Sequence, residues 1–127
     1  MMNDWRAFSK KAKFVVEDHT ILVELSEGRS QKVFVEDEGE DGYFRAWSIA
    51  VGASSMSATH ESPEFFAWRR NHLSDLVGFK IDRKGRLIGE AWIPAEGLDA
   101  EEWAIYIKAL AQSCDRIEYM LTGKDQL

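Results

Sequence analysis

The chain has 127 residues, of which 45% are hydrophobic, 30% charged and 12% aromatic, and these proportions are typical of one soluble globular domain rather than of a disordered or fibrous chain. Its 16 basic and 22 acidic residues give a formal net charge of −6, which disfavours general nucleic-acid binding because it repels a phosphate backbone. The single cysteine, Cys114, cannot form an intrachain disulfide. With no apolar run of the signal-peptide or membrane-span type, we expect a cytoplasmic domain over residues 1–127 that binds no membrane.

The first half of the chain predicts a short helix followed by an antiparallel meander of three strands. The helix is indicated by apolar residues at spacings of three and four, namely Trp5, Phe8 and Ala12. The strands are indicated by runs of β-branched and aromatic side chains, which are separated by glycine-containing turns at 27–30 and 38–42. The predicted elements are, in order, a helix at 4–13 within an N-terminal segment 1–13, and strands at 14–25, 31–37 and 43–51.

The second half predicts a helix, a hairpin and a final helix. Ser62 followed by Pro63 is typical of a helix start. Asp82 and Gly85 suit the first and last positions of a type I turn between two strands. The predicted elements are a loop at 52–60, a helix at 62–74, strands at 77–81 and 86–93, and a helix at 99–123.

The final helix has the strongest signals in the chain. Asp99 can cap it, Glu102 stands three residues later, and Gly123 is a natural stop. Its apolar residues follow at alternating steps of four and three: Trp103, Ile107, Leu110, Cys114, Ile117 and Leu121. One side of this helix should therefore be buried along its whole length.

These elements predict an α+β fold of the order α-β-β-β-α-β-β-α, with an antiparallel five-stranded sheet and helices segregated from it. This order excludes a parallel nucleotide-binding fold. The sheet residues predicted to face the helices are Ile21, Val23, Leu25, Val33, Val35, Phe44, Phe79, Ile81, Leu87, Ala91 and Ile93.

Two stretches resemble the YbjN-like family, which shares its fold with the type III secretion chaperones. They are residues 29–35 followed by 44–48, and residues 77–82 with 97–102. The resemblance covers about residues 14–123 and consists of strand patterning and a helix cap. It implies a secretion-chaperone-like domain that is frequently a homodimer, and that in the secretion branch binds extended segments of client proteins without chemistry. YbjN-like members themselves are linked to regulation and stress.

The residues that could hold a metal or act as nucleophiles do not group in the sequence. They are His19, His60, His72 and Cys114. None has partners at ligand spacing, and a thiol on the apolar stripe of the last helix is expected to be buried and unreactive. The acidic turn at 36–42 does not match a calcium loop, because its oxygen ligands do not alternate through to a distal glutamate. We therefore expect no enzyme, no metal and no cofactor.

Strand periodicity sends a second set of side chains to the side of the sheet away from the helices. This set combines large apolar groups with both charges, and such a patch on a monomer is typical of an interface. We predict that a client peptide buries apolar side chains there, while Arg45 and Lys32 select its acidic neighbours. The alternative is that the N-terminal helix or the 53–60 loop covers this face as ordinary core. The predicted binding residues are Leu22, Lys32, Phe34, Arg45, Trp47, Ile88 and Trp92.

The helix predicted at 62–74 is apolar on more than one side and must be buried twice. One side can contact the sheet, and the other is predicted to contact a second copy across a twofold axis. The predicted dimer-interface residues are Phe65, Phe66, Trp68 and Arg69. The sequence thus predicts a homodimeric protein- or peptide-binding module, chaperone-like or regulatory; the alternative is a regulatory or structural subunit that binds one fixed protein partner through this helix.

Overall fold

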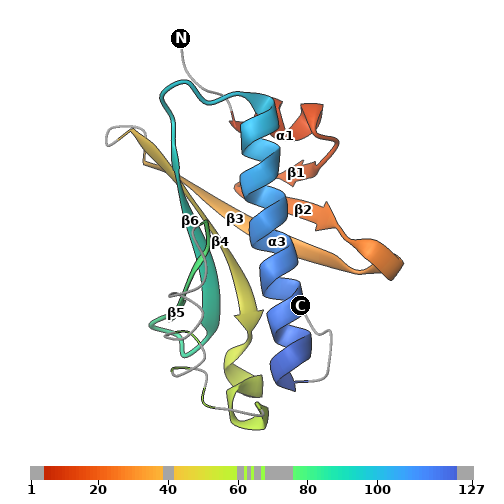
Figure 1. Ribbon diagram of the computed structural model, residues 1–127, viewed down its shortest axis with the longest axis vertical. Helices are drawn as coiled ribbons and strands as arrows, with labels where there is room; N and C mark the ends of the chain where they lie inside the picture. The colour runs from red at the N-terminus through yellow and green to blue at the C-terminus, as the bar shows by residue number, and fades with distance from the viewer. Residues whose placement is uncertain are drawn as a thin grey trace.

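The computed structural model describes residues 5–38, 42–59, 62, 64, 67 and 76–122. In this part of the chain the long helix α3 runs along one face of an antiparallel sheet, and the short helix α1 lies beside the N-terminal half of α3 (Figure 1). Two short 3₁₀ segments, η1 (Ser26–Gly28) and η3 (Ala53–Ala58), follow β2 and β4. The helices and strands are α1 (Trp5–Lys11), β1 (Val15–Glu17), β2 (Thr20–Glu24), β3 (Ser30–Glu38), β4 (Tyr43–Val51), β5 (Gly78–Ile81), β6 (Leu87–Pro94) and α3 (Ala100–Thr122).

The sheet has six strands in the order β1-β2-β3-β4-β6-β5, so the predicted number of five is wrong. The run 14–25, predicted as one strand, is a hairpin in which Glu17 of β1 pairs with Thr20 of β2. The chain turns between them because Asp18 adopts a positive φ of 57°, a conformation that aspartate tolerates better than most residues. A turn of only two residues is difficult to predict from a sequence that is otherwise rich in β-branched side chains.

The helix predicted at 62–74 lies largely outside the described residues, and so does Gly123, the predicted stop of the last helix. Of the 62–74 segment, the structure describes Ser62, Glu64 and Ala67, and Ala67 is buried. The region 52–60, predicted as a loop, contains η3, whose Met56 packs against the hydrophobic core.

Helix α3 begins as predicted. The Asp99 carboxylate accepts a hydrogen bond of 2.8 Å from the backbone N–H of Glu102, which caps the helix. The apolar stripe on one side of α3 is buried against β3, β4 and β6. Its members are Trp103, Ile107, Leu110, Cys114, Ile117 and Leu121.

The side chains that complete this core come from the sheet face predicted to meet the helices. Nine of the eleven predicted residues are buried there, whereas Leu25 and Ile81 are only partly buried. Leu25 lies just beyond β2, and Ile81 is the last residue of the edge strand β5. Both positions have fewer neighbouring strands to cover them.

Candidate functional site

We call the side of the sheet opposite α3 the far face. Directly paired residues on neighbouring strands point to the same side, and the register aligns two rows there. One row joins Phe34 of β3 to Trp47 of β4 and Glu90 of β6. The next joins Glu36 and Arg45 to Trp92 on the same three strands. The fold therefore brings four of the predicted binding residues, Phe34, Arg45, Trp47 and Trp92, into one continuous area.

Aromatic rings form two contacts in this area. Phe34 stacks on Trp47 with their ring centroids 4.4 Å apart and their planes inclined by 25°. Tyr43 meets Trp92 edge to face, with centroids 6.4 Å apart. The Trp92 residue is 51% exposed and Tyr43 is 44% exposed, so this second pair presents apolar surface to solvent. Sequence reasoning did not single out Tyr43, although its position two residues before Arg45 places it on the same face.

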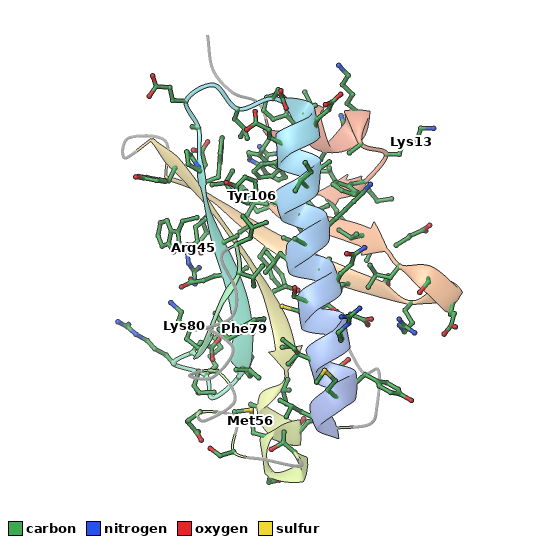
Figure 2. The ribbon with its side chains drawn as sticks, viewed as in Figure 1. Lys13, Arg45, Met56, Phe79, Lys80 and Tyr106 are labelled. Carbon is green, nitrogen blue, oxygen red and sulfur yellow. The ribbon has the colours of Figure 1, made fainter. Side chains whose placement is uncertain are left out.

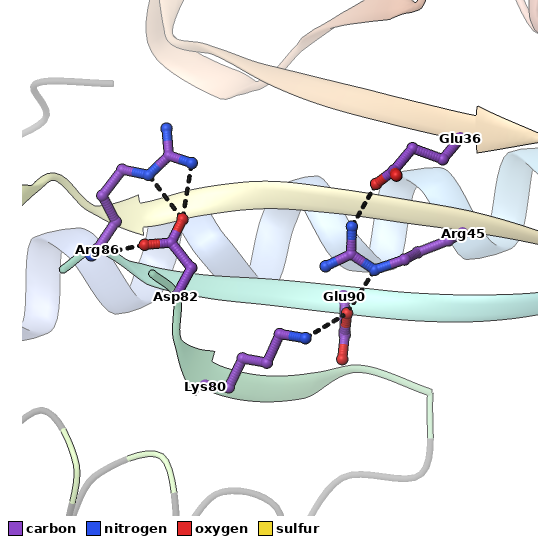
Figure 3. A network of polar contacts seen from close by, with 6 residues as sticks. All are labelled: Glu36, Arg45, Lys80, Asp82, Arg86 and Glu90. Atoms are coloured by element: carbon purple, nitrogen blue, oxygen red, sulfur yellow. Dashed lines mark hydrogen bonds and ion pairs between the residues drawn. The ribbon is translucent and has the colours of Figure 1, made fainter. Parts of the chain in front are cut away.

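Charged side chains hold the second row together (Figure 3). The guanidinium of Arg45 lies between two carboxylates, pairing with Glu36 and, through Nε at 2.7 Å, with Oε2 of Glu90. Lys80 on β5 reaches the same Glu90 oxygen at 3.3 Å. Figure 2 shows that Arg45 and Lys80 both point away from α3. Since Arg45 has two acceptors within the chain, its role in selecting acidic groups of a partner stays a prediction.

Three other predicted binding residues have different surroundings. Ile88 is only 2% exposed, and its directly paired neighbours are Ile49 on β4 and Lys80 on β5. It therefore offers little surface to a partner. Leu22 and Lys32 pair with each other across β2 and β3, with Leu22 half-buried and Lys32 exposed. They extend the far face beyond Phe34.

The two segments that the sequence analysis named as possible covers of the far face, the N-terminal helix and the 53–60 segment, both contact α3 in the described part of the chain. In α1, Trp5 packs against Trp103 on the core side with ring centroids 6.1 Å apart. The 3₁₀ segment η3 likewise contacts α3. The predicted dimer-interface residues Phe65, Phe66, Trp68 and Arg69 lie outside the described residues.

A groove of about 800 Å³ runs along the far face from Trp47 to the turn between β5 and β6. The guanidinium carbons of Arg86 and Arg45 lie 5.3 and 5.7 Å from the Trp47 ring centroid, within the range of cation–π attraction. The lining residues are Glu36, Arg45, Trp47, Lys80, Ile81, Asp82, Arg83, Lys84, Arg86 and Ile88.

The turn at the end of this groove is fixed by Asp82. One oxygen of its carboxylate accepts hydrogen bonds from the backbone N–H groups of Lys84 and Arg86 at 3.0 and 2.9 Å, and the other accepts from Arg86 Nε at 2.8 Å. Desolvation raises the pKa of the Asp82 carboxyl, but the hydrogen bonds and charge of Arg86 and the N–H of Lys84 outweigh it and hold the pKa below its ordinary value. Gly85 has a positive φ of 78°, as the predicted type I turn requires.

A second groove, of about 820 Å³, lies on the other side of the molecule between α3 and the segment after β2. Arg29 and Asp115 both line this groove and form an ion pair of 3.1 Å. Tyr119 and Met120 stand at its rim with exposed side chains. Sequence reasoning missed this groove, and the only signal for it was two large apolar residues on the polar side of the last helix.

In the described part of the chain, the residues that could bind a metal or act as nucleophiles do not cluster. No group of His, Cys, Asp and Glu side chains there is placed to hold a metal ion. Burial raises the pKa of the Cys114 thiol to about 12. His60 and His72 lie outside the described residues. Within the same ranges, no helix has the length and hydropathy to cross a bilayer.

Comparisons with known proteins identify the fold. No protein-family model matches the sequence, so the YbjN-like resemblance stays a prediction. No curated protein matches it either. Solved structures do match, and three of them follow.

The first is a chain in the structure of the Yersinia pestis type III secretion chaperone SycH in complex with a stable fragment of YscM2, with 10% identity over 89% of this chain and 95% of that one, at a TM-score of 0.56. The second is a chain of the ExoU–SpcU complex from the type III secretion system of Pseudomonas aeruginosa. The identity is 16%, the match covers 98% of this chain and 100% of that one, and the TM-score is 0.61. The third is a chain of the ExsC–ExsE complex. The identity is 16%, the match covers 93% of this chain and 92% of that one, and the TM-score is 0.63. The predicted secretion-chaperone-like fold is thus confirmed at the level of architecture.

Proposed function

We propose that this chain is a non-enzymatic, chaperone-like module that binds an extended segment of a client protein on its far face. The observation that carries the proposal is the half-exposed indole of Trp92, which lies against Tyr43 in the row next to the Phe34–Trp47 stack. Large aromatic side chains on a preformed sheet bind partners with little loss of conformational entropy. This surface needs no rearrangement before a client side chain contacts it.

The comparisons support a protein partner. The structures that share this fold are described as SycH with a fragment of YscM2, as the heterodimer of ExoU and SpcU, and as the complex of ExsC with ExsE. Each one contains a second protein. We extend that property, binding of another polypeptide, to this chain as part of the proposal.

In the proposed mechanism, apolar side chains of the client lie on Trp92 and Tyr43. Removal of apolar area from water supplies the driving force, about 25 cal/mol per Å² before the entropy costs of association are subtracted. The ion pairs of Arg45 with Glu36 and Glu90 fix the side chains between the two aromatic contacts. They neutralise these charges within the chain, so a client does not have to desolvate an unpaired ion there. The binding is thus expected to be weak and tolerant of sequence.

We also propose that the module acts in the cytoplasm as a homodimer, with contacts from Phe65, Phe66, Trp68 and Arg69. The support is the apolar character of the 62–74 segment on more than one side. Sedimentation equilibrium at tens of micromolar should give twice the 14.5 kDa of one chain. A mass of one chain at that concentration would contradict the dimer and leave the client site unaffected.

Fluorescence anisotropy with labelled peptides tests client binding. Several short peptides that alternate leucine or phenylalanine with serine should all bind, and Trp92→Ala should weaken each of them roughly tenfold, the usual effect of removing an interface aromatic. The matched control is Tyr119→Ala, which removes an aromatic side chain that is also more than half exposed, from α3 on the other side of the molecule. It should leave the affinities unchanged.

Two results would count against the proposal. If Tyr119→Ala weakens binding while Trp92→Ala does not, the client site is the groove beside α3. If no peptide binds and one protein partner forms a single tight complex that tolerates Trp92→Ala, the chain is a subunit dedicated to one fixed partner.

A further inference from the structure

The groove between Trp47 and the β5–β6 turn carries a charge opposite to that of the whole protein. The chain has a net charge of −6, yet among the residues that the structure describes, five cations line this groove against two carboxylates, Glu36 and Asp82. The cations are Arg45, Lys80, Arg83, Lys84 and Arg86. Counting the adjacent Glu90 as a third carboxylate still leaves an excess of positive charge.

The five cations have two different roles. Arg45 and Arg86 are partly buried and are paired with carboxylates of the chain, Arg86 with Asp82 at 2.6 Å. Both also lie near the Trp47 ring, so they form part of the floor. These two side chains maintain the groove and are not available to a ligand without breaking internal contacts.

The other three cations stand at the rim. Lys80 is half exposed and shares the Glu90 oxygen with Arg45. Arg83 and Lys84 are exposed, and in the part of the chain that the structure describes neither side chain has an ion-pair partner. Both lie in the turn that the Asp82 carboxylate fixes, so their backbone positions are set before any ligand arrives. The excess charge is therefore concentrated on accessible side chains of a preorganised hairpin.

The floor between these cations is apolar in part. The Trp47 ring and Ile81 both line it, and the floor also contains the carboxylates of Glu36 and Asp82. A nucleic acid, with a phosphate at every residue, would bring negative charge against those two carboxylates. A polypeptide that alternates acidic and apolar side chains can place its carboxylates at the rim and its apolar groups over the indole.

We infer that this groove binds an acidic segment of the client, with carboxylates of the client paired to Arg83, Lys84 and Lys80 and an apolar side chain on Trp47. The inference deepens the proposed function and rests on it: the aromatic surface around Trp92 supplies the affinity, and the hairpin selects clients by charge. This selection belongs to the β5–β6 turn rather than to Arg45 and Lys32, the residues that the sequence pattern singled out.

The test compares two labelled peptides that differ in charge alone, one of alternating leucine and glutamate and one of alternating leucine and glutamine. The glutamate peptide should bind roughly threefold to tenfold more tightly, the effect of two partly exposed ion pairs. Its advantage should shrink as ionic strength rises. The double variant R83Q/K84Q should remove most of the preference and leave only the contribution of Lys80. The control K108Q/R116Q, which removes one lysine and one arginine from the exposed side of α3, should preserve the preference.

The outcomes separate the inference from the proposed function. Equal binding of both peptides, each weakened by Trp92→Ala, would overturn the acidic selection and leave client binding intact. A preference that is unchanged by R83Q/K84Q would also overturn it. Binding of neither peptide would overturn both. Tighter binding of a single-stranded oligonucleotide than of the glutamate peptide would show that the groove takes phosphates and would contradict the inference.

Discussion

The indole nitrogen of Trp103 donates a hydrogen bond of 2.8 Å to the hydroxyl of Ser9, although the two residues are 94 positions apart. The Ser9 hydroxyl in turn donates to the backbone carbonyl of Trp5 at 2.7 Å. This chain of bonds attaches α1 to α3 within the core and keeps α1 on the side of the sheet away from the proposed client surface. The contribution of these hydrogen bonds to the free energy of unfolding can be measured.

Ser9→Ala should lower the free energy of unfolding by about 1–3 kcal/mol, because it leaves the buried indole N–H of Trp103 without an acceptor. Urea denaturation followed by circular dichroism measures the change. Ser26→Ala, in the exposed segment η1, is the control and should stay within about 0.5 kcal/mol of the parent. A Ser9→Ala protein as stable as the control would show that α1 is not held by this bond.

Arg45→Met should lower the free energy of unfolding by roughly 1–2 kcal/mol, between the values typical of exposed and of buried ion pairs. The substitution keeps most of the side-chain volume but removes the cation that pairs with both Glu36 and Glu90, while Lys80 still pairs with Glu90. In a double-mutant cycle, Glu90→Gln should reduce the effect of Arg45→Met. Strict additivity of the two substitutions would show that the pair does not interact.

Cys114 should be unreactive in the folded protein. Burial raises its pKa to about 12, so at pH 8 the thiol is protonated as well as inaccessible, and the thiolate that alkylating reagents require is absent. Labelling with iodoacetamide should therefore proceed only as fast as the protein opens, and should become rapid in urea. Because the chain has one cysteine, the label reports this site alone. Fast labelling under native conditions would mean that α3 separates from the sheet readily.

Gly89→Ala should lower the free energy of unfolding by about 1–3 kcal/mol through overpacking. A methyl group built at this position lies 2.7 Å from the Cys114 sulfur and 3.0 Å from the Phe79 ring. The closer contact disappears in a Cys114→Ala background, so the same substitution should be less destabilising there. Thermal unfolding of the four proteins of this cycle measures the difference. An equal effect in both backgrounds would place the strain at Phe79 instead.

Parts of this structure could be predicted from local pattern. The final helix could be predicted because its cap, Asp99, and its buried apolar stripe are both encoded within a short stretch of chain. The turn from Asp82 to Gly85 was predictable for the same reason, since one side chain and one positive φ determine it. The alternation of buried and exposed positions in the sheet followed from strand periodicity.

Other parts depend on which strands become neighbours, and a single sequence does not specify this. Ile88 was predicted as binding surface, but it is only 2% exposed whereas Trp92 on the same strand is 51% exposed, and periodicity alone does not distinguish these two positions. The role predicted for Arg45 in selecting acidic groups of a partner stays a prediction, but the sequence did not reveal that the register brings Arg45 opposite Glu36 and close to Glu90. The second hairpin strand was missed because a single residue, Asp18, reverses the chain. Each difference arises from long-range pairing or from one backbone conformation.

The central claim is that a client binds the far face of the sheet, and the indole N–H signals of the tryptophans test it most directly. Trp47 and Trp92 lie on that face, whereas Trp5 and Trp103 lie in the core beneath α3. In a ¹⁵N-labelled protein titrated with the leucine–glutamate peptide, the signals of Trp47 and Trp92 should shift with a common saturation curve while those of Trp5 and Trp103 stay in place. Shifts confined to Trp5 and Trp103, with Trp47 and Trp92 unchanged at saturation, would contradict the account.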